Sequence, residues 1–77
     1  MRRHIIIGKI VYVALEGGFY GIEGVDGREW YPLDLPDQFK KNGLSVAVQA
    51  IERTDAFSSA MWGTPIQILT VLSEDEK

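Results

Sequence analysis

The amino-acid sequence predicts an all-β fold, a small closed barrel with one short helix. Turn-forming residues recur about every 8–15 residues, a spacing typical of several short strands. The segments between these turns contain many Ile and Val residues, which favour pleated structure. Only Leu33–Asn42 combines helical spacing of apolar residues with helix start and stop signals.

The first predicted strand runs from Ile5 to Leu15 and is long for so small a protein. Ile10 and Tyr12 share one face, whereas Val13 and Leu15 share the other, and this switch predicts a bulge or a coil near Tyr12. Gly8 can bend the strand further. A long, coiled first strand would allow contact with both halves of a small barrel.

Two glycine-containing turns separate the next strands. Gly17-Gly18 predicts a tight turn before a second strand, Phe19–Val25. Asp26-Gly27 is among the strongest hairpin signals, and it predicts a third strand at Arg28–Pro32. Pro32 cannot donate a ladder hydrogen bond, so the strand ends there or lies at an edge.

The helical segment Leu33–Asn42 carries its own boundary signals. Pro36 suits the first turn of a helix, where its missing N–H does no harm. Asp37 complements the positive end of the helix dipole, and Lys40 and Lys41 complement the negative end. Asn42-Gly43 then provides a C-terminal stop.

Two strands complete the predicted fold. The fourth covers Leu44–Arg53, where apolar and small or polar residues alternate, and the last covers Pro65–Leu72. The segment between them, Thr54–Gly63, is predicted to be a loop. The element order β-β-β-α-β-β is that of a five-stranded OB-like barrel. The alternative is an SH3-like barrel, whose helical turn comes later in the chain.

Length and composition indicate one domain. Its 77 residues leave no room for a second, and we expect the domain to cover residues 1–72, with an acidic, frayed tail at 73–77. The sequence contains no cysteine, and the apolar run Ile5–Ile7 is far too short for a signal peptide or a membrane span. We therefore expect a cytoplasmic protein that does not act at a membrane.

The chain also resembles a known group of proteins. The similar segments are Glu16–Ile22, Asp26-Gly27 through Tyr31-Pro32, Leu35-Pro36 with Phe39, and Met61–Ile66. Their combination resembles a family of small prokaryotic, archaeal and bacterial, OB-like domains of unassigned function, and it covers roughly two thirds of the chain. The resemblance implies the barrel and implies no activity. The chain departs from the pattern of that family at Asp34, where Asn would be expected before Leu-Pro.

Residue types give little support to catalysis or metal binding. The single histidine, His4, lies near the N-terminus, where we expect a solvated residue rather than a general base. One histidine and no cysteine make a zinc site unfavourable, and Asp34 and Asp37 are better explained as residues at a helix start. We expect a protein that is not an enzyme and that uses no cofactor and no metal.

The aromatic residues are the more informative candidates. OB barrels bind single strands on the face of the second and third strands and on adjoining loops. On this basis the candidate ligand-binding residues are Arg28, Trp30, Phe57 and Trp62. The alternative is that Tyr31, Trp62 and one of Phe19 and Tyr20 only close the barrel ends. Trp30 is predicted to lie outside the core, because Tyr31 on the opposite face is the natural core residue.

Two functions remain open. The first is a non-enzymatic binding or interaction module, a monomer that uses a barrel face to bind a protein or a small ligand. The second is a single-stranded nucleic-acid binding OB domain. The net charge of −3 and the pI of about 4.9 disfavour the second, because phosphate contacts require a basic surface. A continuous positive groove joining Arg28, Lys40, Lys41 and Arg53 would favour it.

Overall fold

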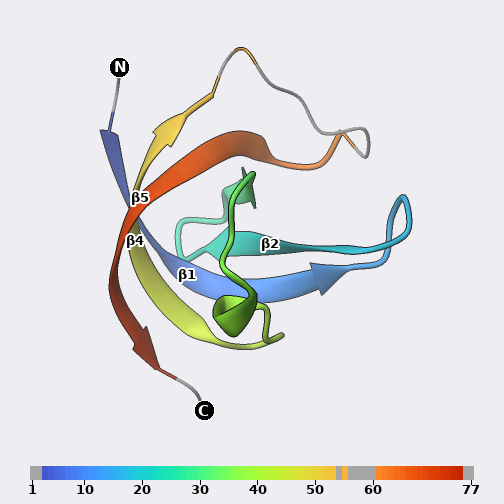
Figure 1. Ribbon diagram of the computed structural model, residues 1–77, viewed down its shortest axis with the longest axis horizontal. Helices are drawn as coiled ribbons and strands as arrows, with labels where there is room; N and C mark the ends of the chain where they lie inside the picture. The colour runs from blue at the N-terminus through green and yellow to red at the C-terminus, as the bar shows by residue number, and fades with distance from the viewer. Residues whose placement is uncertain (1–2, 54, 56–60, 76–77) are drawn as a thin grey trace.

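The computed structural model describes residues 3–53, 55 and 61–75. Within these residues five strands close a barrel in the order β1-β2-β3-β5-β4 (Figure 1). The elements are β1 (Arg3–Val13), β2 (Phe19–Gly24), β3 (Glu29–Pro32), the single 3₁₀ turn η1 (Asp37–Phe39), β4 (Ser45–Glu52) and β5 (Thr64–Asp75). The predicted all-β barrel and its element order are confirmed. No helix in the described residues is long and apolar enough to cross a membrane.

The long first strand connects the two halves of the barrel. Its residues Arg3–Lys9 pair antiparallel with β4, and Gly8–Val13 pair antiparallel with β2. The two pairings overlap at Gly8 and Lys9, and a Cβ atom at Gly8 would overlap the backbone carbonyl of Glu23. Glycine at this position therefore lets β2 approach closely enough to pair. Parallel pairing of β3 with β5 completes the closure.

The bulge expected near Tyr12 is absent from β1, whose register with β2 runs unbroken from Gly8 to Val13. The burial pattern nevertheless changes after Ile10, since Tyr12 is exposed whereas Val11 and Val13 are partly buried. The register shifts lie instead between β4 and β5, where Leu69 and Leu72 are the extra residues of β5. These bulges increase the local twist that bends β5 around the barrel.

Residues from all five strands fill the interior. Inward-facing side chains alternate with exposed ones along β1 and β4, and Phe39 of η1 contributes to the same core. The buried apolar residues are Ile6, Ile10, Ile22, Trp30, Phe39, Leu44, Val46, Val48, Ala50 and Ile66. Burying one large aliphatic side chain of this kind stabilises a fold by about 1.5–3 kcal/mol.

The helix predicted over Leu33–Asn42 is reduced to the three residues of η1. Leu33 continues the barrel ladder by donating its N–H to the Ile66 carbonyl, so the chain is still extended there. The Asp34 side chain accepts the backbone N–H of Ile68 (3.0 Å) and is not available to cap a helix. Pro36 occupies the N-cap position and makes no side-chain capping hydrogen bond. This end of the segment therefore does little to favour a helix longer than one turn.

The last strand is longer than predicted. It begins at Thr64 and continues to Asp75, three residues beyond the predicted end at Leu72. Ser73–Asp75, which the sequence placed in an acidic tail, pair with Ala47–Ser45 at the start of β4. Residues 76–77 lie outside the described residues.

Candidate ligand-binding face of the barrel

Trp30 lies in the core, and the prediction that it lies outside the core is wrong. Its side chain is 3% exposed, whereas Tyr31 is only half-buried. The register explains this result, because Trp30 pairs with the fully buried Ile22 and therefore shares its inward face. Tyr31, one residue later, points to the outer face.

Arg28 and Trp30 lie together at one end of the barrel. The Arg28 guanidinium lies 4.2 Å from the Trp30 ring centroid, and the His4 ring lies 5.3 Å from it. His4 Nε2 also contacts Glu52 Oε2 at 2.7 Å, so the predicted solvated terminal residue is a partly buried member of β1. These contacts cover Trp30 and remove it from any outer binding face.

Trp62, by contrast, lies on the outer face of β2. Its indole ring covers Gly21, where a Cβ atom would overlap the ring atoms Cζ3 and Cη2. Positive φ angles at Met61 (52°) and Gly63 (75°) turn the backbone on both sides of Trp62. Gly63 packs directly on the β3 backbone, since a Cβ there would lie 3.2 Å from the Glu29 carbonyl. The turn therefore holds the indole against the barrel wall.

Three aromatic rings are in contact in series on this face, with Phe19 in the middle, and we refer to Phe19, Tyr31 and Trp62 as the aromatic row. Phe19 contacts Tyr31 edge to face, with centroids 5.2 Å apart and an angle of 84°. It also contacts Trp62 at 5.7 Å and 62°. Edge-to-face pairs of this kind fix ring orientation and contribute about 0.5–1.5 kcal/mol beyond area burial. All three side chains remain partly exposed.

A groove adjoins the aromatic row at the end of the barrel near the β1–β2 turn. It has a volume of about 340 Å³, and we call it the aromatic groove. Tyr12 and Tyr20 pack edge to face at 5.3 Å on one side, and Lys40 lies on its rim. Phe19 and Tyr31 belong to both the row and the groove, so the two form one continuous surface.

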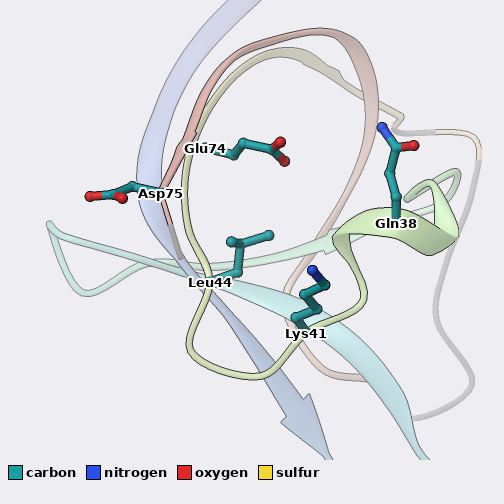
Figure 2. A pocket seen from close by; sticks show the side chains of 5 residues that line it. All are labelled: Gln38, Lys41, Leu44, Glu74 and Asp75. Atoms are coloured by element: carbon teal, nitrogen blue, oxygen red, sulfur yellow. The ribbon is translucent and has the colours of Figure 1, made fainter. Parts of the chain in front are cut away.

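A second hollow of about 400 Å³ lies between the segment around η1 and the end of β5 (Figure 2). Its lining is formed by Gln38, Lys41, Leu44, Glu74 and Asp75. Figure 2 shows Glu74 pointing into the hollow and Asp75 pointing away from it. The lining is mostly polar and contains no aromatic ring, so the aromatic groove is the better candidate for a binding site.

The basic residues do not form the continuous groove that nucleic-acid binding would favour. Lys40 Nζ contacts Asp37 Oδ1 at 2.8 Å, and this hydrogen bond and the Lys40 charge lower the pKa of Asp37. Arg53 donates to both carboxylate oxygens of Asp55 (2.9 and 2.8 Å), which raises the pKa of Arg53 and lowers that of Asp55. Among the described residues, Arg28, Lys40 and Lys41 line three different hollows.

Acidic residues occupy the remainder of the outer β2–β3 face. Glu23 and Glu29 are directly opposite each other in the register, and both are exposed. Lys9 of β1 is opposite Glu23 on its other side. The surface next to the aromatic row therefore carries two carboxylates and one ammonium group.

The structure thus brings Arg28 and Trp30 together but separates them from Trp62, and Phe57 lies outside the described residues. Phe19 and Tyr31, which the sequence reading allowed only as residues that close the barrel, lie beside Trp62 on the outer face. No protein-family model matches this chain, and neither a curated protein nor a solved structure matches it significantly.

Proposed function

We propose that this protein is a non-enzymatic binding module with an OB-type barrel, and that its contact surface is the aromatic row with the aromatic groove. The parallel closure of β3 on β5 and the turn between β3 and β4 support an OB-type barrel. OB barrels bind ligands across strands 2 and 3 and the loops beside them, which is where the aromatic row lies. The observation that carries the proposal is the Trp62 indole packed against Gly21 while still partly exposed.

An extended protein segment is the ligand class that fits this surface best. Aromatic-lined grooves bind extended, proline-containing segments because such segments lose little conformational entropy on binding. The flanking carboxylates of Glu23 and Glu29 disfavour a polyanion. Lys40 on the groove rim is already paired with Asp37, which leaves less positive charge to attract phosphate. The cysteine-free composition supports a role in the reducing cytoplasm.

Single-stranded nucleic acid is the second candidate ligand, and the three adjacent, partly exposed rings favour it. Stacking of a base on an exposed aromatic ring contributes about 1–3 kcal/mol and tolerates any sequence. Binding of this kind would depend on Trp62, as peptide binding would, but it would weaken steeply as salt concentration rises.

The experiment is an NMR titration of the ¹⁵N-labelled protein with a short proline-rich peptide and, separately, with oligothymidylate at low salt. We expect the peptide to shift the Trp62 indole signal and the Phe19 and Tyr31 amides, and Trp62→Ala to abolish these shifts. Leu72→Ala is the matched control, because Leu72 is an exposed residue of β5. Salt-sensitive shifts with oligothymidylate alone would support the nucleic-acid alternative instead.

A further inference from the structure

The first half of β1 extends beyond its partner β2. Pairing with β2 begins at Gly8, and the Val25 N–H adds one further hydrogen bond to the Ile7 carbonyl (2.9 Å). Arg3–Ile6 pair with β4 on one side, but no described strand pairs with them on the other. Figure 1 shows this blue segment running beside β4, away from β2.

Alternation along the strand shows which backbone groups face the unpaired side. Ile10 exchanges hydrogen bonds with Gly43 and Leu44, on the side of β4. The Ile7 carbonyl faces the opposite side, where it accepts from Val25. Since successive strand residues direct their N–H and C=O groups to opposite sides, those of Ile5 and Arg3 face the same way as those of Ile7. A further strand could pair with these groups.

Exposed apolar side chains follow this edge. Ile5 (60% exposed), Ile7 (54%) and Val25 (79%) form an apolar stripe. The same three residues, together with Arg28 and Trp30, line a groove of about 180 Å³. An added strand would place alternate side chains on the stripe and in the groove.

We propose that the free edge of β1 binds an extended segment of a partner protein in which apolar and acidic residues alternate. Among the described residues, two oppositely charged pairs lie around the edge, His4 with Glu52 and Lys9 opposite Glu23. The other charged groups are Arg3, Arg28 and Asp26, which accepts the backbone N–H of Arg28. Outside the two pairs, the two cations outnumber the one anion, so a carboxylate in the groove would be stabilised beside Arg28. This strand-addition site is separate from the aromatic row and does not rest on the proposed function.

A second copy of this chain fits the edge less well. Antiparallel pairing of two copies about Ile5 would place Arg3 of one copy opposite Ile7 of the other, and His4 opposite Ile6. The added strand would then direct His4 and Ile6 to the groove side and supply no carboxylate beside Arg28. An acidic partner segment supplies one.

The test uses the full ¹⁵N-labelled chain and a short capped peptide of alternating aspartate and valine, with a lysine–valine peptide as the charge-reversed control. We expect the acidic peptide to slow amide hydrogen exchange at Arg3 and Ile5 by about tenfold or more. It should also shift the Trp30 indole signal. Equal protection by the lysine peptide, or no protection at either amide, would overturn the proposal.

The variant Ile5→Pro separates strand addition from folding. It removes the N–H that faces the unpaired side and leaves the groups that pair with β4, so the barrel should remain folded. Peptide-dependent protection at Arg3 should be lost in Ile5→Pro and retained in Ile5→Val. Sedimentation of the protein without peptide then shows whether two copies of the chain associate. A dimer that protects Arg3 and Ile5 without peptide would assign the edge to a second copy and contradict the proposed partner.

Discussion

Gly21 gives the outer face of β2 the flat surface on which the Trp62 indole lies. Without a side chain at this position, the ring can rest directly on the strand backbone. The positive φ of Met61 is uncommon for a residue with a side chain, and together with that of Gly63 it turns Trp62 back onto the barrel. The geometry of the aromatic row therefore depends on a few residues that have no direct role in ligand contact.

Gly21→Ala should displace the Trp62 indole from the barrel wall. The new methyl group overlaps the far edge of the ring, which can move, and not the core backbone. We therefore expect the free energy of unfolding to fall by no more than about 1 kcal/mol, with a red shift of Trp fluorescence and loss of peptide binding. Ser73→Ala, at an exposed site in β5, is the control. Unchanged fluorescence would show that Trp62 does not cover Gly21.

Trp30→Ala should be far more damaging than Trp62→Ala. Trp30 is a core residue, and truncation of a buried Trp costs about 3–5 kcal/mol. Urea denaturation monitored by circular dichroism gives the comparison. A Trp30→Ala protein as stable as the parent would place the side chain outside the core.

At the scale of elements, the connection from β3 to β4 is held by hydrogen bonds to β5. Leu33 donates its N–H to the Ile66 carbonyl, and Asp34 Oδ1 accepts from the Ile68 N–H. These bonds extend the β3–β5 contact past the end of the parallel ladder. They keep the chain extended where its sequence favours a helix.

Asp34→Ala should weaken this closure by about 0.5–1.5 kcal/mol, the net contribution of one hydrogen bond. Asp34→Asn should retain most of the stability, because the amide oxygen can accept the same N–H. Hydrogen exchange at the Ile68 amide, together with chemical denaturation, measures both effects. Equal destabilisation by the two substitutions would contradict the assigned role of the Asp34 oxygen.

The turns could be predicted from the sequence because their determinants are local. Gly18 and Gly27 adopt φ angles of 92° and 87°, as glycine turns allow, and each joins the predicted strands. The inward direction of Trp30 was missed because it depends on register. Across the Asp26-Gly27 turn, the Gly24 N–H donates to the Arg28 carbonyl. Continuing this pairing along the two strands would have placed Trp30 opposite Ile22.

The remaining errors concern contacts between distant parts of the chain. The extent of the helix after Pro32 depends on the Asp34 contact with Ile68, which lies 34 residues away. Trp62 was a candidate from the sequence alone, but its position over Gly21 and beside Phe19 requires the closed barrel. No local pattern distinguishes an aromatic row on the outer face from rings that close a barrel end.

In the whole molecule, closure of the barrel leaves two exposed surfaces that differ in chemistry. The aromatic row and groove present rings beside the carboxylates of Glu23 and Glu29. The β1 edge presents aliphatic side chains beside Arg3 and Arg28. Closed barrels pair most of their strand edges, so an edge left unpaired is available for contact with another chain.

The acid stability of the barrel should depend weakly on the Arg53–Asp55 pair. Because Arg53 lowers the pKa of Asp55 in the folded state, the pair stabilises the fold above the unfolded aspartate pKa of about 3.9. This contribution is lost as pH falls through the lower folded pKa. Asp55→Asn should therefore lower the thermal midpoint slightly at pH 7 and leave it unchanged near pH 2. An equal loss at both pH values would show that the carboxylate charge is not involved.

Whether the outer face of β2 and β3 binds the ligand can be measured by following the two indole N–H signals during titration with the proline-rich peptide. We expect the Trp62 signal to shift and saturate, the buried Trp30 signal to stay in place, and Gly21→Ala to remove the effect. A peptide that shifts Trp30 and leaves Trp62 unchanged, or that shifts neither indole signal, would show that this face is not the binding surface.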